Sequence, residues 1–444
     1  MPGGMHIVQI TNHGMHEWRV IPGLPDTGGQ NVYVNALTEA LLRLGHRVTV
    51  ANRGGYAHPL TGAGRRGSVD HPSGRARIVY LDDRLPEFVP KEQMADRIPE
   101  LAGALAPVLE EGPVDLILSH YWDGGLLGLE AARRAGVAAP HVWVPHSLGA
   151  IKRRNTDPTR WSGLRLEERI AFEHEVAAGA DAVAATSGVI ADSLRGDYGV
   201  EPAMWMPPGV DAGRYRPLPV SACRATLDLL AGRLGASPEE VRGRPMVVEV
   251  SRTDVTKRKD VLVEAFAAAL EQVPDALLAV TVDGTNRVLH DRLRDLIRSR
   301  GVEGSVAVLG SVWEHLPALY SLARCYCTPS VMEGFGMSAA EAAAAGTPVV
   351  ASPLVPFAVE YLLGGSPRRV AVEGAPDLLV GEGAVVAGAD SVPAFGAALG
   401  MLLADPALAG RMGRAARSAV VPGLTWDHLA RRFMDRVSAG VASD

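Results

Sequence analysis

The sequence predicts an α/β protein of two consecutive domains, each with a parallel sheet whose strands alternate with helices. The chain has 444 residues, of which 47% are hydrophobic and 21% are charged, a composition typical of globular proteins. A single hydrophobic core stops growing at about 250–300 residues, so a chain of this length is expected to divide. Short β-branched runs alternate with amphipathic stretches in both halves, which is typical of parallel α/β sheets.

In the N-terminal half, each short apolar run is expected to form one strand of the first sheet. These runs are His6–Thr11, Arg47–Ala51, Arg77–Leu81, Val114–Ser119, His141–Pro145 and Asp181–Thr186. Proline and glycine interrupt the pattern at Pro207–Asp211 and Arg214–Pro219, where the two domains are expected to join. We therefore expect residues 1–212 to form the N-terminal domain.

A second series of runs predicts the sheet of a C-terminal domain over residues 213–424. These runs are Met246–Val250, Leu277–Val282, Val306–Leu309, Arg324–Thr328 and Pro348–Ala351. Helical periodicity predicts helices between them, at Val261–Gln272 and Val288–Arg298 among others. The last segment, residues 425–444, is expected to carry an amphipathic helix at Trp426–Val437.

The balance of charges disfavours partners that need a strongly basic surface. The 44 basic and 50 acidic residues give a formal net charge of −6, without the basic field that nucleic acids or anionic membranes normally require. The cysteines, Cys223, Cys325 and Cys327, are too few for a disulfide scaffold and do not have zinc-ligand spacing. The chain starts with a strand pattern rather than a signal peptide. We expect a cytoplasmic protein with no nucleic-acid partner and no membrane partner.

Several common catalytic signatures are missing from the sequence. It contains no G-x-x-x-x-G-K-[ST] phosphate loop, and no G-x-G-x-x-G turn follows the first strand. The metal-binding pattern H-E-x-x-H and the serine-hydrolase pattern G-x-S-x-G are also absent. These absences disfavour P-loop ATPases, simple dehydrogenases, zinc hydrolases and serine hydrolases.

A glycine pair, Gly28 and Gly29, precedes the first expected helix, which runs to about Arg43. Glycines let a backbone approach a ligand closely, and a helix start offers unpaired N–H groups to an anion. The same pattern also fits a glycine turn that only caps the helix.

A second glycine turn, Gly334–Gly336, lies between Glu333 and Glu341 in the C-terminal half. The turn opens an expected helix whose first amides can hold phosphate or sugar oxygens. Carboxylates suit sugar hydroxyls, because those hydroxyls are hydrogen-bond donors. The alternative is that both glutamates are acids that stabilise a helix start.

Two cations, Arg252 and Lys257, follow the first strand of the C-terminal domain. Ligands of open α/β sheets bind at the carboxyl ends of strands, so this loop and the Glu333 loop are expected to face one crevice. A diphosphate there would meet a planar guanidinium and a compact ammonium, and a solvated charge run is the alternative. The chain has 40 arginines and only four lysines, which are Lys91, Lys152, Lys257 and Lys259.

Seven segments, taken in order, resemble retaining glycosyltransferases of family 4, which have the GT-B fold. They are DTGGQNVYV (26–34), PKE (90–92), HYWDGG (120–125), PHSLG (145–149), PPGVD (207–211), SRTDVTK (251–257) and EGFGMSAAE (333–341). This family includes sucrose-phosphate synthases, mannosylfructose-phosphate synthases and the mycothiol-pathway N-acetylglucosaminyl-inositol-phosphate synthase. The resemblance implies two Rossmann-like domains that face each other across a cleft, with the C-terminal helix packing back on the N-terminal domain.

The resemblance also implies a set of donor-binding residues. Arg252 and Lys257 would neutralise the donor diphosphate, Glu341 would bind the ribose, and His146 would lie near the donor sugar. Gly29 would approach the phosphate from the other domain. The donor sugar would be held by Glu333 and by the amides of Gly334, Phe335, Gly336, Met337 and Ser338. The expected catalytic residues are His146, Arg252, Lys257 and Glu333.

Negative charge grows on the departing diphosphate during glycosyl transfer, and fixed cations stabilise it. Because Arg252 and Lys257 would supply those cations, we expect no metal and no other cofactor. In the usual proposal for retaining enzymes of this kind, the leaving phosphate oxygen takes the acceptor proton, so protein carboxylates serve to position the substrates.

For the acceptor, the resemblance points to a phosphorylated sugar or cyclitol. Lys91, Tyr121, Ser147 and Arg169 match residues that hold the acceptor phosphate in the inositol-phosphate enzyme, and Asn31 matches one that contacts the acceptor ring. The segment from PHSLG to Arg154 is more similar to the mannosylfructose branch.

The expected function is retaining transfer of a hexosyl group from a UDP- or GDP-sugar to this small acceptor, and a homodimer is one possible assembly. One alternative is transfer to an unphosphorylated acceptor, such as an aminocyclitol or glycerate. The others are a nucleotide-sugar epimerase of the same fold and a non-catalytic sugar-nucleotide sensor. The spacing of Glu333 and Glu341 argues against the epimerase, and the intact Arg252, Lys257 and Glu341 argue against the sensor.

Overall fold

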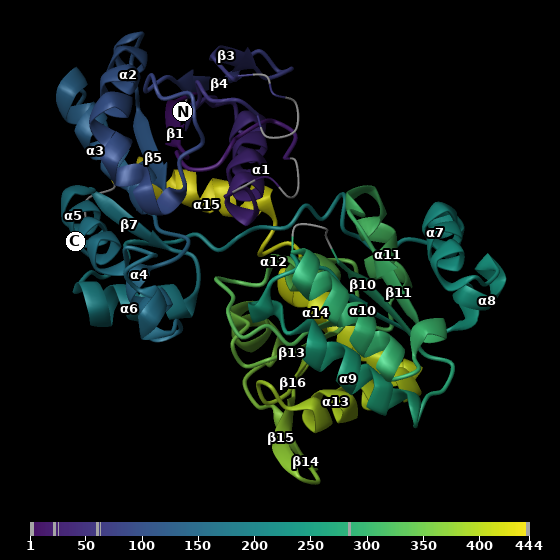
Figure 1. Cartoon of the computed structure of the whole chain (residues 1–444). Coiled ribbons are helices and arrows are strands. Elements are labelled where there is room, and N and C mark those ends of the chain that lie inside the picture. Colours follow the sequence, from purple (N-terminus) through teal and green to yellow (C-terminus); the bar gives the residue numbers. More distant parts are fainter. Residues whose placement is uncertain are drawn as a thin grey trace. The chain divides into compact units, whose positions relative to one another are not determined.

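A computed structural model describes residues 4–20, 24, 26–58, 62, 64–282 and 286–440. The chain forms two compact units (Figure 1). Unit 1 comprises Met1–Gly209 and Trp426–Asp444, and unit 2 comprises Val210–Thr425. The junction thus falls a few residues before the expected end of the N-terminal domain at residue 212.

Unit 1 is built on a sheet of strand order β3-β4-β2-β1-β5-β6-β7-β8, parallel except for β3. Its strands are β1 (His6–Ile10), β2 (Arg47–Arg53), β3 (Gly67–Asp70), β4 (Ala76–Leu81), β5 (Leu116–His120), β6 (His141–Val144), β7 (Ala182–Ala185) and β8 (Met204–Trp205). Every strand expected in this half is present. The sheet order reverses between β1 and β5, which are neighbours.

Successive residues of these strands enter different cores, because side chains alternate across a sheet. Ile7 packs in one core with residues such as Val34 and Phe433, whereas Val8 packs in the other with residues such as Leu105 and Leu127. Apolar residues therefore occur at consecutive positions, as is typical of strands buried on both faces. The helices of unit 1 are α1 (Gly29–Arg43), α2 (Ile98–Glu110), α3 (Tyr121–Ala135), α4 (Gly149–Arg154), α5 (Leu166–Gly179), α6 (Gly188–Tyr198) and α15 (Trp426–Ser438).

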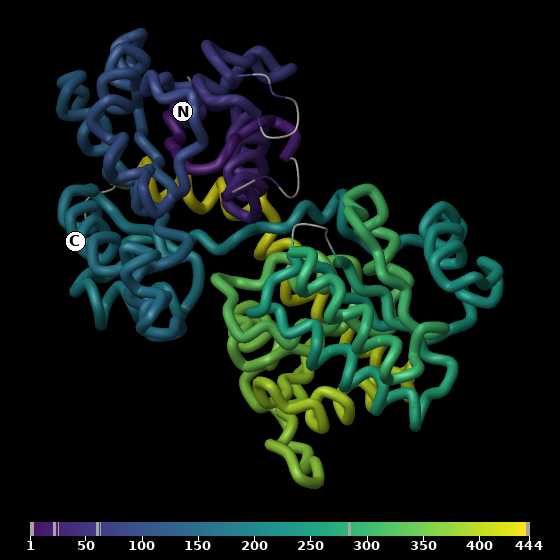
Figure 2. The backbone as a smooth tube through the Cα atoms, in the orientation of Figure 1, coloured from purple at the N-terminus to yellow at the C-terminus, as the bar shows by residue number. Residues whose placement is uncertain are grey.

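Helix α15 follows unit 2 in the chain but packs within unit 1, where Figure 2 shows it in yellow among purple and blue elements. The indole of Trp426 meets the ring of Tyr33 edge-on, with 4.9 Å between centroids. Trp426 also lies against Gly209, where an added Cβ would come within 2.7 Å of the indole. Glycine at position 209 therefore allows the close approach of this helix.

Unit 2 has a sheet of order β11-β10-β9-β12-β13-β16-β15-β14, whose last two strands, β15 and β14, are joined antiparallel. Its strands are β9 (Met246–Glu249), β10 (Leu277–Thr281), β11 (Val306–Leu309), β12 (Cys325–Thr328), β13 (Val349–Ala351), β14 (Arg368–Val372), β15 (Ala375–Val380) and β16 (Ala384–Val386). The five strands expected from the sequence are all present. The order reverses between β9 and β12.

The helices of unit 2 are α7 (Arg224–Leu234), α8 (Pro238–Gly243), α9 (Lys259–Leu270), α10 (Arg287–Ser299), α11 (Leu316–Leu322), α12 (Met337–Ala344), α13 (Val392–Ala404) and α14 (Pro406–Val420). Short turns of other helix types complete the chain: η1 (Lys91–Arg97), η2 (Pro158–Arg160), η3 (Val220–Cys223), η4 (Val255–Lys257), η5 (Glu303–Ser305), η6 (Trp313–His315) and η7 (Ala358–Leu362).

Within the described ranges, no single helix has the length and apolar character needed to cross a membrane. The bent pair α13 and α14 satisfies that test jointly, with an angle of 101° between the two helices.

Candidate functional site

The loops that follow β9 and β12 meet at the point where the order of the unit 2 sheet reverses. Val331 N–H donates to the carbonyl of Thr256 over 2.8 Å, and the Ser330 hydroxyl donates to the same carbonyl over 3.2 Å. Open α/β sheets bind ligands at such a reversal. The two loops expected to face one crevice are therefore in direct contact.

Lys257 and Glu333 face each other across these loops. Lys257 Nζ lies 2.5 Å from Glu333 Oε1, and both side chains are largely buried. The turn that carries Lys257 is shaped by Asp254, whose Oδ1 accepts from Thr256 N over 2.9 Å and from Thr256 Oγ1 over 2.6 Å. Arg252 is exposed, and its guanidinium makes no hydrogen bond or ion pair with the described residues. One expected cation is thus already paired, whereas the other is open to solvent.

Helix α12 begins with a sharp glycine turn. Gly336 has φ of 111°, and a Cβ there would lie 2.7 Å from Val355 Cγ1. Phe335 anchors the turn, with its ring 5.5 Å from that of Phe357. In the described part of the chain, no hydrogen bond uses the amides of Met337, Ser338 and Ala339. These amides form a helix start that suits an anion or sugar oxygen.

Glu341 lies on α12 among tyrosines. Its Oε2 accepts a hydrogen bond of 3.0 Å from the Tyr320 hydroxyl. Burial raises the pKa of Glu341 to about 7, although hydrogen bonds from Tyr320 and Tyr215 and the charge of Arg214 act in the opposite direction. The carboxyl therefore changes its charge near neutral pH.

In unit 1, His146 has a left-handed backbone, with φ of 55°, and lies two residues after the end of β6. Its Nε2 lies 2.9 Å from His120 Nδ1, and His120 Nε2 lies 3.0 Å from Gln9 Oε1. Because Gln9 Oε1 only accepts, His120 donates from Nε2 and accepts at Nδ1, so His146 donates from Nε2. Nδ1 of His146 is left as an acceptor. Burial, and after it the nearby His13, lowers the pKa of His146 to about 3, so the imidazole is neutral.

Arg169 brings together most of the residues expected to bind the acceptor. It donates to Tyr121 Oη over 2.8 Å, and to the carbonyl and hydroxyl oxygens of Ser147 over 2.8 and 3.3 Å. Its Nε donates to buried Glu173 over 2.7 Å. Most of the guanidinium is therefore occupied by protein groups, and Tyr121 and Ser147 are held beside it.

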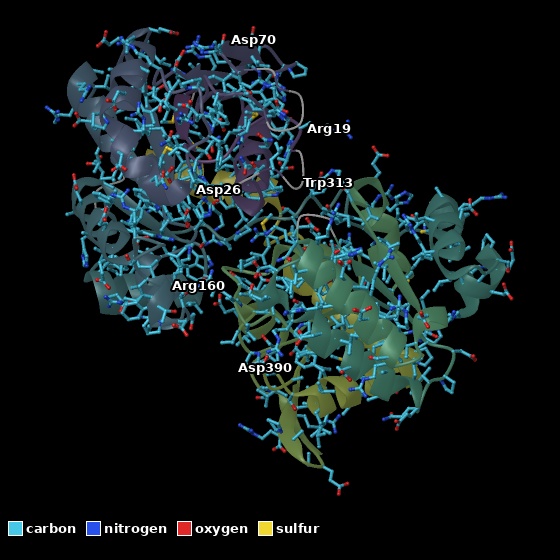
Figure 3. The ribbon with its side chains drawn as sticks, viewed as in Figure 1. Arg19, Asp26, Asp70, Arg160, Trp313 and Asp390 are labelled. Atoms are coloured by element: carbon cyan, nitrogen blue, oxygen red, sulfur yellow. The ribbon has the colours of Figure 1, made fainter. Side chains whose placement is uncertain are left out.

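Lys91 lies in the same region and pairs with Asp26, which precedes α1 and is labelled in Figure 3. The Lys91 backbone N–H also donates to Asp26 Oδ2 over 3.0 Å. Although burial alone would lower the pKa of Lys91, the Asp26 carboxylate raises it. Lys91 is therefore charged at neutral pH.

A pocket beside these residues is rich in cations. It is lined by Lys91, Glu92, Trp122, Lys152, Leu164, Arg165, Glu168, Arg169 and Phe172. Lys152 is 3.8 Å from Glu92 Oε1, and burial, followed by the charges of Arg169 and Lys91, lowers the pKa of Lys152 to about 8. Four basic side chains thus converge on one pocket with two carboxylates.

Gly29 and Asn31 lie at the start of α1. Gly29 is exposed, as the approach to a ligand requires. Asn31 is buried, and its side chain accepts from Gly28 N over 3.0 Å and lies 3.1 Å from His16 Nδ1. The amide of Asn31 is therefore engaged within the protein.

Sequence reasoning missed several neighbours of these residues. Lys152 was not assigned to the acceptor site, although its rarity among the basic residues was a usable signal. Arg165 gave no signal among 40 arginines. Tyr215 and Tyr320, which bond to Glu341, come from other elements and could not be associated with it by spacing.

Two α/β units, each with polar and charged groups gathered where its strand order reverses, define the GT-B class of glycosyltransferase. Residues 27–214 match the model of the family described as Glycosyltransferase Family 4, and residues 236–419 match that of Glycosyl transferases group 1. The chain belongs to glycosyltransferase family 4, whose members are retaining GT-B enzymes. This confirms the resemblance and the fold class expected from the sequence.

Relatives with assigned names resemble the chain over most of its length. A mannosylfructose-phosphate synthase of Agrobacterium fabrum is 32% identical over 78% of this chain and 75% of its own. A D-inositol 3-phosphate glycosyltransferase of Actinosynnema mirum is 32% identical over 93% of this chain and 92% of its own. A sucrose-phosphate synthase structure from Thermosynechococcus elongatus has the same fold, with a TM-score of 0.78, 24% identity and 98% coverage of each chain.

Proposed function

We propose that this glycosyltransferase moves a hexosyl group, with retention, from a nucleoside-diphosphate sugar to a small phosphorylated sugar or cyclitol. Unit 2 would bind the donor and unit 1 the acceptor. The names of the relatives from Agrobacterium fabrum and Actinosynnema mirum, both of which include a phosphate, support this choice of acceptor.

On the donor side, the proposal gives each group at the unit 2 reversal one task. Arg252 and Lys257 meet the diphosphate, and the free amides at the start of α12 hold oxygens of the donor sugar. The carboxyl of Glu341 accepts from the ribose hydroxyls. When the bond to the sugar breaks, charge grows on the diphosphate, and Lys257 and Arg252 stabilise it. We propose that this transfer needs no divalent metal.

One observation carries the choice of a phosphorylated acceptor, namely the cation-rich pocket of unit 1. Among the described residues, no carboxylate lies closer to Lys152 than 3.8 Å, and burial, followed by the charges of Arg169 and Lys91, lowers its pKa. A phosphate would compensate the charge of Lys152 through charge-assisted hydrogen bonds. Lys91 would share its ammonium between Asp26 and the phosphate. Arg169 would act mainly by holding Tyr121 and Ser147 in place.

A transfer assay with radiolabelled UDP- and GDP-sugars tests the proposal. Each donor is offered sugar and cyclitol phosphates and the same acceptors without phosphate. We expect transfer to at least one phosphorylated acceptor, in the presence of EDTA, at ten times or more the kcat/KM for its unphosphorylated counterpart. Turnover of unphosphorylated acceptors only would overturn the phosphate assignment, and activity that EDTA abolishes and magnesium restores would overturn metal independence.

Variants of residues that line the pocket test whether this pocket binds the acceptor. Lys91→Ala and Lys152→Ala should raise the acceptor KM and leave slow donor hydrolysis unchanged. Arg154→Ala is the matched control, because Arg154 lies on the same helix as Lys152 but is half-exposed and pairs with Asp197. If both lysine variants transfer normally, the pocket does not bind the acceptor.

A further inference from the structure

A buried ion pair joins the two ends of the unit 2 loop that carries Arg252 and Lys257. Glu249 is the last residue of β9, and Lys259 is the first residue of α9. Lys259 Nζ lies 2.7 Å from Glu249 Oε2, and the two side chains are 6% and 1% exposed. The proposed function assigns no part to this pair, although the loop between its members is the one proposed to meet the donor diphosphate.

The ammonium of Lys259 also holds the backbone where the loop begins. It donates to the carbonyl of Ser251 over 3.1 Å and to the carbonyl of Thr281, at the end of β10, over 2.5 Å. The Thr281 hydroxyl donates to the same Ser251 carbonyl over 3.0 Å and accepts from Ser251 N over 3.0 Å. An ammonium has three hydrogens to donate, and the protein uses all three here. Both backbone groups of Ser251 are therefore fixed, one residue before Arg252.

The lysines on either side of Arg258 pair with two different glutamates. Lys257 pairs with Glu333 across the site, whereas Lys259 pairs with Glu249 at the end of β9. Arg258 has a left-handed backbone, with φ of 50°, which is uncommon for a residue with a Cβ atom. The chain thus turns sharply between the lysine proposed to meet the diphosphate and the lysine that closes the loop.

The stability of α9 does not explain a lysine at its first position. A cation in the first turn of a helix interacts unfavourably with the helix dipole. A buried ion pair is also weak evidence for stability, because removing two charges from water costs about as much as their attraction returns. Among the described residues, Glu249 Oε1 has no hydrogen-bond partner. What the pair does provide is a defined position for the loop.

We propose that Lys259 is a positioning residue of the donor site, which holds the loop of residues 250–258 in the conformation that presents its two cations to the diphosphate. Glu249 is its counter-ion. The inference rests on the proposed function and deepens it, because fixed cations stabilise a growing charge only where they are already in place. Lys259 touches no substrate in this role, and no bond to it forms or breaks.

The main test replaces both members of the pair, by Glu249→Leu together with Lys259→Met, here termed the pair variant. It leaves no buried charge unpaired, so its melting temperature should fall by no more than about 5 °C. Calorimetry with UDP and GDP measures binding. For the nucleoside diphosphate that the wild type binds more tightly, the Kd should rise about tenfold or more, as for a lost hydrogen bond to a charged group.

The corresponding nucleoside, which has no phosphate, separates positioning from general damage to the fold. Its affinity, measured by displacement calorimetry, should be the same in the wild type and in the pair variant. In transfer assays, the pair variant should show a raised donor KM and a lowered kcat, with the acceptor KM unchanged. A smaller fraction of folded protein would lower only the apparent kcat.

A second variant perturbs the same link without changing a charge. Thr281→Val removes the hydroxyl that bonds to both backbone groups of Ser251 and keeps a similar shape. It should also raise the Kd of the diphosphate and leave that of the nucleoside unchanged. The matched control is Glu264→Leu together with Arg300→Met, which removes a partly exposed ion pair between α9 and the end of α10. This control should bind the diphosphate as the wild type does.

The inference is overturned if the pair variant binds the diphosphate as tightly as the wild type, or if its affinities for nucleoside and diphosphate fall by the same factor. Failure of the proposed donor site has a different signature. In that case Arg252→Ala and Lys257→Ala bind the diphosphate as the wild type does. A wild type that binds no nucleoside diphosphate would overturn both.

Discussion

Lys257 and Glu333 are 76 residues apart in the sequence, yet their charged atoms lie 2.5 Å apart. The ammonium proposed to meet the donor diphosphate is therefore held by a carboxylate of the same loop pair. Binding of a diphosphate must compete with Glu333 for this cation or share it.

Lys257→Ala should lower kcat more than it raises the donor KM, because the charge that Lys257 meets is larger in the transition state. We expect a loss of about 10²-fold or more in kcat, as for other groups that stabilise developing charge. Steady-state kinetics with varied donor measures both constants. An effect confined to KM would show that Lys257 serves binding only.

Glu333→Gln removes the competing charge and keeps the shape of the side chain. Nucleoside diphosphate should bind this variant at least as tightly as the wild type, while sugar transfer falls, because Glu333 is proposed to hold the donor sugar. Calorimetry with the bare nucleotide measures the first effect. Weaker nucleotide binding would contradict the competition described above.

Nucleotide affinity should depend on the charge of Glu341. With a pKa of about 7, this carboxyl is mostly protonated at pH 6 and mostly ionised at pH 8. Ribose hydroxyls donate to the ionised form, so the affinity should rise by up to about tenfold over this range and then level off. Calorimetry at several pH values measures this rise in nucleotide affinity. The variant Glu341→Gln should not show it, because only the nucleotide itself then titrates.

Acceptor binding should weaken at alkaline pH as Lys152 loses its proton. Since its pKa is lowered to about 8, a declining fraction of Lys152 is charged between pH 8 and pH 9. The acceptor KM should therefore increase up to about tenfold by pH 9. Lys152→Arg keeps a charge throughout this range, and its KM should stay nearly flat. If the acceptor KM of the wild type and of Lys152→Arg changed with pH in the same way, Lys152 would not be the group responsible for the increase.

Glu173 should be important for folding rather than for chemistry. It is fully buried, accepts from Gly149 N, from Arg169 Nε and from the Tyr198 hydroxyl, and compensates the charge of Arg169. Glu173→Ala leaves that charge buried and unpaired, so we expect a loss of about 3–5 kcal/mol in the free energy of unfolding. Urea denaturation followed by circular dichroism measures it. Glu175→Ala, an exposed glutamate of the same helix, should change stability by less than about 0.5 kcal/mol.

Most strands of both sheets could be predicted, because strands buried on two faces are uninterrupted apolar runs. Strands β3, β8, β14, β15 and β16 escaped prediction. β3 is exposed throughout and β14 is largely so. β8 and β16 are only two and three residues long. Such strands carry no strict alternation that would distinguish them from loops. None of these strands lies at the points where the strand order reverses, between β1 and β5 and between β9 and β12.

Some parts of the proposed site could be predicted because their role follows from the type of residue alone. Examples are the Gly334–Gly336 turn and the cations Arg252 and Lys257. Other parts could not be predicted, because they depend on which side chains contact each other in the folded protein. The sequence does not show that Asn31 bonds to its own helix start, or that Glu173 occupies part of Arg169. Both facts depend on rotamers and on contacts between elements.

The position of α15 has a consequence for biosynthesis. Unit 1 is completed by α15, which the ribosome makes only after all the residues of unit 2. Until then, Tyr33 and the other residues that α15 covers lack this helix, and the apolar surface they form stays exposed. The N-terminal unit therefore cannot reach its native state first, although it is translated first, and a premature stop near residue 425 would leave it open.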